Sequence, residues 1–139
     1  MYKQLKKQLD EKRIIDRTIE ELTDRIEFII HKKLGLKGSS YSDIKIEMIG
    51  VTDDKYLQAF AKVENLDKDR EQLIEEKKII DDFINDVYKS INNMNNLELN
   101  VFKCRYMLGL SNKDTAERLS FSIQRIKQIN KEIIQKLKD

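Results

Sequence analysis

The residues that could do chemistry in this chain are polar side chains near its C-terminal end. The stretch that follows Ser122 is predicted to be a helix, and its exposed face carries glutamines and lysines. In the major groove of DNA, glutamine can pair bidentately with adenine, lysine can reach guanine, and isoleucine can contact a thymine methyl group. The alternative is that these are ordinary surface residues. We expect six of them to read bases: Ser122, Ile123, Gln124, Lys127, Gln128 and Lys131.

Further cations in the same region of the chain are candidates for contacts with DNA phosphates. Such contacts hold a protein on the duplex without reading its sequence. The alternative interpretation of these charges is a solvated basic helix face. The five candidates are Arg105, Lys113, Arg118, Arg125 and Lys136.

A helix-turn-helix is the arrangement that would position these side chains. Ser111 is a suitable N-cap for a helix over residues 112–119, and Ser122 for a longer basic helix over residues 123–137. Ala116 would let the two helices approach closely, and Ser120 stands where the turn often has glycine. A left-handed backbone at a residue other than glycine costs about 1 kcal/mol, which is tolerable. We expect the core contacts of the motif at Thr115, Leu119, Phe121, Ile126 and Ile129.

Another amphipathic helix is predicted immediately before this motif. It starts near Leu97 and ends at Gly109. The single cysteine, Cys104, lies within it and is interpreted as a small core residue. The remaining apolar residues on the face of this helix are Val101, Phe102, Tyr106 and Leu108.

The first 96 residues are predicted to form two long helices. The first runs from about Tyr2 to Leu34, and the second begins after Thr52 or Asp53, either of which suits an N-cap. Apolar residues recur along each at three- and four-residue spacings, as on one face of a helix. The first stripe is Leu5, Leu9, Ile15, Ile19, Leu22, Ile26, Ile29 and Leu34. The second is Phe60, Val63, Leu66, Leu73, Ile80, Ile84, Val87, Ile91 and Met94.

Two such stripes can pack as an antiparallel hairpin or as a coiled coil. Charged residues at Arg70 and Lys77 interrupt the second stripe, and the asparagine-rich residues 92–96 suit the end of its helix. The pattern leaves open whether the stripes pair within one chain or between two. Residues 41–51, with Ile44, Ile46 and Met48 alternating, are interpreted as an ordered connection packed on a helix.

The composition excludes several classes of protein. With no proline, four glycines and 37% charged residues, the chain cannot supply the turns of a β-sandwich or barrel. No apolar run is long enough to span a membrane, and the start lacks the apolar segment of a signal peptide, so we expect a cytoplasmic protein. No phosphate loop, nucleophile motif or ligand cluster around His31 is visible, so we expect no enzyme, cofactor or metal.

The net charge of +2 hides a strong asymmetry along the chain. Residues 1–40 carry ten basic and seven acidic side chains, and residues 41–96 carry eight and thirteen. Residues 97–139 carry nine basic and five acidic side chains, a net +4. The positive charge therefore accumulates on the segment predicted to contact DNA.

Three stretches of that segment resemble the fourth region of bacterial sigma factors. In that family the domain reads the −35 promoter element and contacts the flap of RNA polymerase. Nothing upstream resembles the sigma region that melts the −10 element. Arginine and glutamate are common in the family at the positions of Ile123 and Gln124, so we expect a target other than the standard −35 sequence. The stretches are Tyr106-Met107-Leu108-Gly109-Leu110-Ser111, Ala116-Glu117-Arg118-Leu119 and Ser122-Ile123-Gln124-Arg125-Ile126-Lys127-Gln128-Ile129.

The whole chain resembles phage or prophage late-gene transcriptional activators of the autolysin-regulator (ArpU) kind, which join a charged helical half to a sigma-like end. The resemblance implies a sequence-specific regulator that helps RNA polymerase start at a few promoters. Its fold is expected to be all-α, with long helices over residues 1–96 and a helix-turn-helix domain over residues 97–139. The expected partners are double-stranded DNA, RNA polymerase and a second copy bound through the long helices.

Two other classes of protein remain open on the sequence. A phage small terminase subunit also joins a helix-turn-helix to a helical oligomerisation region, but it forms rings and packages DNA. A coiled-coil adaptor would use its C-terminal domain to bind protein. Oligomer mass separates the first class from a regulator, and salt-sensitive DNA affinity separates the second.

Overall fold

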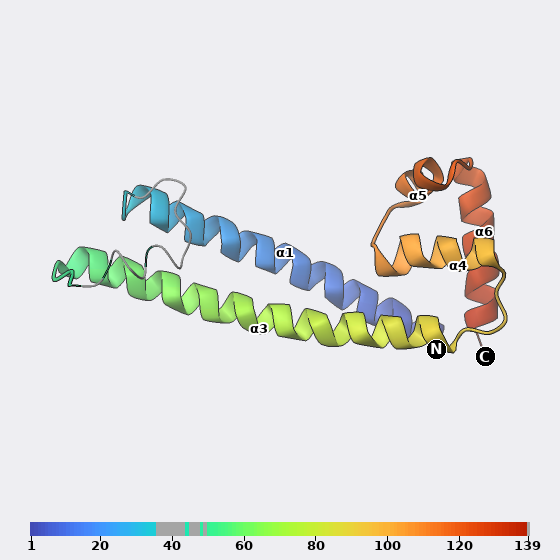
Figure 1. Ribbon diagram of the computed structural model, residues 1–139, viewed down its shortest axis with the longest axis horizontal. Helices are drawn as coiled ribbons and strands as arrows, with labels where there is room; N and C mark the ends of the chain where they lie inside the picture. Colours follow the sequence, from blue (N-terminus) through green and yellow to red (C-terminus); the bar gives the residue numbers. More distant parts are fainter. Residues whose placement is uncertain (36–43, 45–47, 49, 139) are drawn as a thin grey trace. The chain divides into compact units, whose positions relative to one another are not determined.

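Most of the chain that the structure describes is helical. The computed structural model describes residues 1–35, 44, 48 and 50–138, and these residues form no strand. This confirms the all-α prediction of two long helices followed by a helix-turn-helix region (Figure 1). The elements are α1 (Tyr2–Lys32), α3 (Asp54–Ser90), α4 (Asn96–Phe102), the π-helical segment η1 (Lys103–Met107), α5 (Asn112–Leu119) and α6 (Ile123–Leu137).

The chain divides into two compact units. One is Arg13–Lys77, and the other is Met1–Lys12 together with Lys78–Asp139. The division between the two units falls within α1 and within α3. The predicted domain boundary at residue 97 instead lies where the long helices give way to short ones. That boundary stays a prediction. None of the described helices is long and apolar enough to cross a membrane.

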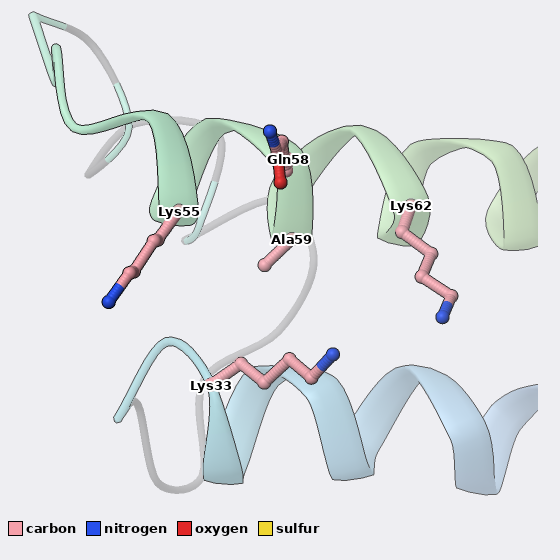
Figure 2. A pocket seen from close by; sticks show the side chains of 5 residues that line it. All are labelled: Lys33, Lys55, Gln58, Ala59 and Lys62. Carbon is pink, nitrogen blue, oxygen red and sulfur yellow. The ribbon is translucent and has the colours of Figure 1, made fainter.

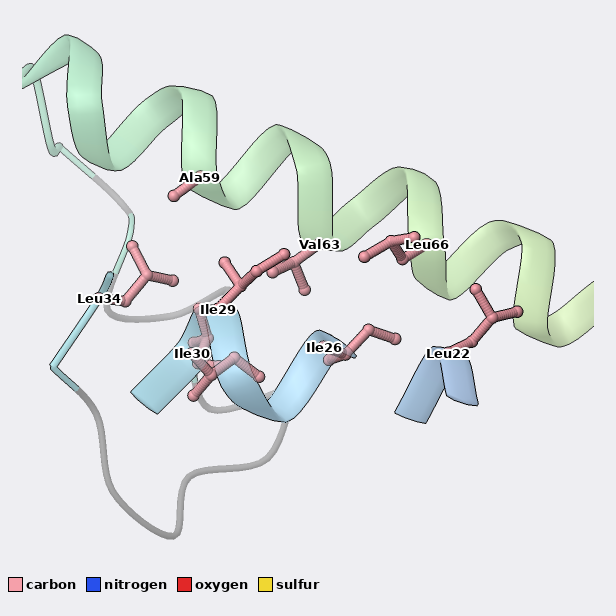
Figure 3. Close-up of a cluster of buried hydrophobic side chains, with 9 residues drawn as sticks. Leu22, Ile26, Ile29, Ile30, Leu34, Ala59, Val63 and Leu66 are labelled. Atoms are coloured by element: carbon pink, nitrogen blue, oxygen red, sulfur yellow. The ribbon is translucent and has the colours of Figure 1, made fainter. Parts of the chain in front are cut away.

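The unit Arg13–Lys77 has a core in which α1 and α3 pack against each other within the chain. Figure 3 shows apolar side chains of both helices filling the space between them. The predicted stripes therefore meet over this stretch of their length. Ile44 is also fully buried in this cluster, while the alternation predicted around it lies largely outside the described residues. The buried members are Leu22, Ile26, Ile29, Ile30, Leu34, Ile44, Ala59, Val63 and Leu66.

The two charged interruptions of the second stripe make polar contacts to α1. Arg70 donates to the Thr23 hydroxyl at 3.2 Å and forms an ion pair with Asp67 at 2.6 Å. Lys77 forms an ion pair with Asp16 at 2.6 Å. The positions that break the apolar pattern are therefore points where the two helices bond to each other.

In the other unit, the start of α1 and the end of α3 are also linked. Lys12 of α1 forms an ion pair with Asp81 of α3. Leu5, Ile84 and Val87 are buried there, as the stripes predict. This linkage holds the end of α3 that leads into the short helices.

Side-chain caps determine where α3 and α4 begin. Asp53 Oδ1 accepts the Lys55 N–H at 2.9 Å, so Asp53 rather than Thr52 caps α3. Helix α3 ends at Ser90, and Asn95, near the end of the asparagine-rich stretch, caps α4. This stretch thus ends one helix and starts the next.

Candidate nucleic-acid interface

The helices α5 and α6 begin at the serines predicted to cap them. Ser111 Oγ accepts the Asp114 N–H at 3.0 Å, and Ser122 Oγ accepts the Arg125 N–H at 3.1 Å. Each bond satisfies an amide that has no partner within its own helix. The bounds of both helices agree with the predicted ones.

The turn between the two helices is left-handed at Ser120. Its φ is 61° and its ψ is 41°, and it has the only positive φ among the described residues other than glycine. The Ala116 carbonyl accepts both the Ser120 N–H and, at 2.9 Å, the Phe121 N–H. The turn therefore has the geometry that usually selects glycine, although this chain has serine there.

The core under α6 is largely as predicted, with one correction. Thr115, Ala116, Ile126 and Ile129 are buried, but Phe121 is 40% exposed and Leu119 only half-buried. The prediction that Phe121 packs in the core is wrong. Phe121 lies in the turn, between left-handed Ser120 and the next cap, so helical periodicity does not determine where its side chain points. Ile133 and Leu137 complete the buried face of α6.

The segment before α5 corrects a second prediction. The helix from Asn96 is α-helical only to Phe102 and continues as the π-helical η1, and Leu108 is 54% exposed. A π-helical bond from the Leu108 N–H to the Lys103 carbonyl (2.9 Å) shifts the later side chains around the axis. Leu108 therefore leaves the apolar face on which regular spacing had placed it. Gly109 follows with a φ of +69°, which favours glycine.

The six predicted base-reading residues are all exposed: Ser122 directly precedes α6, Lys131 lies just past its middle, and the other four lie in its first half. Ser122 is also the N-cap, so its hydroxyl is already bonded to the helix. Gln128 Oε1 accepts Arg125 Nη1 at 3.2 Å, which leaves the amide group of Gln128 as its free donor. Ile123, next to the cap, presents an apolar surface to solvent.

The structure separates the five predicted phosphate-binding cations into two groups. Lys113, Arg118 and Arg125 are exposed on α5 and α6. Arg105 is half-buried, and its Nη1 donates to the Leu110 carbonyl at 2.7 Å across Gly109. Lys136 forms an ion pair with Glu98 at 2.6 Å. Arg105 and Lys136 thus both have partners inside the folded domain.

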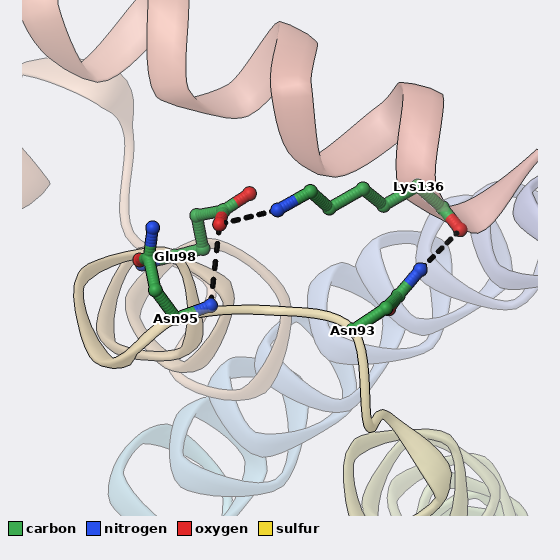
Figure 4. Close-up of polar contacts among 4 residues, drawn as sticks. All are labelled: Asn93, Asn95, Glu98 and Lys136. Atoms are coloured by element: carbon green, nitrogen blue, oxygen red, sulfur yellow. Dashed lines mark hydrogen bonds and ion pairs between the residues drawn. The ribbon is translucent and has the colours of Figure 1, made fainter.

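A buried carboxylate, Glu98, joins α4 to α6. Figure 4 shows its side chain between Asn95 and Lys136, and Asn93 Nδ2 donates to the Lys136 carbonyl at 3.4 Å. Glu98 also completes a capping box, because it accepts the Asn95 N–H while Asn95 accepts the Glu98 N–H. Glu98 is not among the residues predicted from the sequence to matter, although the spacing Asn95-x-x-Glu98 is a signal for a capping box.

The pKa of the Glu98 carboxyl reflects opposing effects. Burial by itself raises this pKa, because the charged form loses water. The hydrogen bonds from Lys136 and Asn95, together with the charge of Lys136, lower it by more, so the pKa lies below its ordinary value. The folded domain therefore holds Glu98 as an anion.

Aromatic packing fixes α4 and η1 against α6. Phe102 is fully buried, and its ring lies 4.9 Å from that of Tyr106. The Tyr106 hydroxyl donates to Asn130 Oδ1 of α6 at 2.7 Å. Burial, with a smaller contribution from Tyr2, raises the pKa of Tyr106 to about 12. These contacts leave the opposite face of α6 free for a ligand.

Two capped helices, a tight turn and an exposed polar face on the second helix define the helix-turn-helix class of DNA-binding domains. Residues 91–139 match the family described as sigma-70, region 4. No curated protein and no solved structure gives a match. The C-terminal region of the chain is thus a sigma-region-4-like DNA-binding domain with a regulatory role.

Proposed function

We propose that the protein is a sequence-specific transcriptional regulator, a phage or prophage activator that works at promoters with RNA polymerase. The observation that supports this most is the exposed polar face of α6 within a domain matched by the sigma-70, region 4 family. The charged helical hairpin before this domain fits the chain organisation of late-gene activators.

The first half of α6 would enter the major groove, where its side chains meet base edges. Gln124 and Gln128 are suited to adenine, Lys127 to guanine, and Ile123 to a thymine methyl group. The exposed cations Lys113, Arg118 and Arg125 would hold the phosphates on either side. Arg105 and Lys136 would contribute mainly by stabilising the domain, because both have partners within it.

A single helix-turn-helix needs a further source of affinity for DNA. One helix-turn-helix buries little surface and reads few bases, so useful affinity calls for a dimer or for help from a bound partner. In sigma factors this region also contacts RNA polymerase, and we propose the same partner for this domain. We propose no catalytic role for this domain.

The test is selection of bound fragments from the source genome, followed by footprinting. We expect a discrete site near a promoter, which disappears with Lys127→Ala combined with Gln128→Ala. The control is Lys68→Ala combined with Gln72→Ala, which removes the same two side-chain types from an exposed face of α3. Uniform binding without sequence preference would overturn the proposal.

Measurement of oligomer mass separates the regulator from a packaging protein. A monomer or dimer agrees with the proposal, and a large ring would instead indicate a small terminase subunit. The ring is expected to bind packaging-site DNA and to have no effect on transcription in vitro.

A further inference from the structure

A pocket in the unit Arg13–Lys77 gathers three lysines from two segments of the chain. Lys55 and Lys62 of α3, and Lys33 directly after α1, line a pocket of about 490 Å³. In Figure 2, Lys55, Ala59 and Lys62 point from α3 toward α1, and Lys33 reaches toward α3 from the other side. Gln58 completes the described lining, which contains no acidic residue. We call these five residues the lysine pocket.

The cations of the lysine pocket differ from those elsewhere between α1 and α3. Arg70 and Lys77 each have an acidic partner within 2.6 Å, whereas the described residues give no ion pair to Lys33, Lys55 or Lys62. Lys55 also lies in the first turn of α3, where the helix dipole disfavours a cation. Three lysines around one pocket make it positively charged, and that charge would attract an anion.

A second pocket continues the first and adds an aromatic surface. It has a volume of about 270 Å³, shares Lys33 and Lys62 with the lysine pocket, and is also lined by Phe28. The Phe28 ring is 58% exposed, although it lies beside the hydrophobic core. Asp24 lines this second pocket together with Lys33, Lys62 and Phe28, whereas the described lining of the lysine pocket itself has no acidic residue.

We infer that the lysine pocket binds the phosphate groups of a nucleotide whose base stacks on Phe28. Lysine binds phosphate as a compact point charge, and an exposed aromatic ring offers a stacking surface to any base. A free nucleoside triphosphate and a single-stranded nucleic acid share this chemistry. The inference does not depend on the role proposed for α6, because all the residues it uses lie in the unit Arg13–Lys77.

Calorimetric titration of the full chain at low ionic strength tests the inference. The probes are ATP, inorganic tripolyphosphate and a short oligothymidylate. We expect saturable binding that weakens at least about tenfold in the double variant Lys55→Gln, Lys62→Gln, because two charge-assisted contacts are lost. Phe28→Ala is expected to reduce ATP affinity to that of tripolyphosphate, since only the nucleotide has a base to stack.

Matched controls separate this site from the rest of the protein. Lys68→Gln removes an exposed lysine of α3 outside the pocket and is expected to leave binding unchanged. Lys127→Ala combined with Gln128→Ala is also expected to have no effect, although it abolishes the proposed promoter binding. Circular dichroism of each variant checks that it is folded.

The outcomes assign the source of the ligand or reject the site. Tight ATP binding with weak oligothymidylate binding assigns a free nucleotide, and the reverse assigns a single-stranded nucleic acid. If no probe binds saturably, or if the Lys55→Gln, Lys62→Gln variant binds like the wild-type chain, the inference is overturned.

Discussion

Single residues decide how firmly α4 is held on α6, and Glu98 is the clearest case. It is a buried carboxylate whose Oε1 bonds to Lys136 at 2.6 Å, and it caps its own helix as well. Lys136→Met would leave that charge buried with fewer partners. We expect a loss of about 1–3 kcal/mol in the free energy of unfolding, measured by urea titration. Lys131→Met, on an exposed face of α6, is the control and is expected to change little.

The depressed pKa of Glu98 makes the stability of the domain depend on pH. Because the folded carboxyl has a pKa below the ordinary 4.5, the unfolded chain binds more protons near that pH. The stabilisation by Glu98 is therefore complete above about pH 5 and is lost as the pH falls through the folded value. Glu98→Gln is expected to flatten this region of the curve of unfolding free energy against pH. An unchanged curve would contradict the role given to Glu98.

The left-handed turn at Ser120 gives a second test at this scale. Ser120→Gly removes the steric cost of a positive φ and is expected to raise the free energy of unfolding by about 0.5–1 kcal/mol. Gly109→Ala introduces the same steric cost at a φ of +69°, where no atom lies close to the new Cβ. We expect it to lower the free energy of unfolding by a similar amount. Thermal unfolding of both variants measures the effects, and shifts of the same sign would contradict this account.

At the scale of elements, the polar contacts between α1 and α3 can be tested by exchanging charges. Asp16→Lys places two cations together and is expected to destabilise the chain by less than about 1 kcal/mol, because the Asp16–Lys77 pair is partly exposed. Adding Lys77→Asp restores the attraction, so the double variant is expected to regain most of the loss. A double-mutant cycle by urea unfolding gives the coupling, and a value of zero would show that the pair does not stabilise the hairpin.

Elements with local signals were predictable from the sequence, and those set by longer-range packing were not. The serine caps at Ser111 and Ser122 gave the bounds of α5 and α6, because capping chemistry involves only neighbouring residues. The π-helical η1 and the exposure of Phe121 occur where the chain departs from regular α-helical geometry, which no periodicity encodes. The exposed face of α6 was predictable as well, because a helical spacing that places apolar residues on one face places polar residues on the other. The internal partners of Arg105 and Lys136 required the folded arrangement.

At the scale of the whole molecule, charge is distributed so that the DNA-binding region attracts phosphate. Residues 97–139 carry nine basic and five acidic side chains, whereas residues 41–96 carry eight and thirteen. Salt should therefore weaken DNA binding in proportion to the phosphates contacted. We expect Arg118→Ala to lower the slope of log affinity against log salt by about 0.9. Lys136→Met is expected to leave that slope unchanged once the protein is folded, which a fluorescence anisotropy titration at several salt concentrations can check.

The polar contacts between α1 and α3 also restrict how the lengths of these two helices can change. Asp16–Lys77 and Thr23–Arg70 are separated by seven residues on each helix, and Lys12–Asp81 follows at a distance of four residues on each. A single residue inserted between Asp16 and Thr23 would rotate everything beyond it by about 100°, so the two contacts could no longer form together. An insertion of seven residues in both helices would preserve the pattern. In related proteins we therefore expect α1 and α3 to be longer or shorter together, by seven residues in each helix. Comparison of their amino-acid sequences can check this.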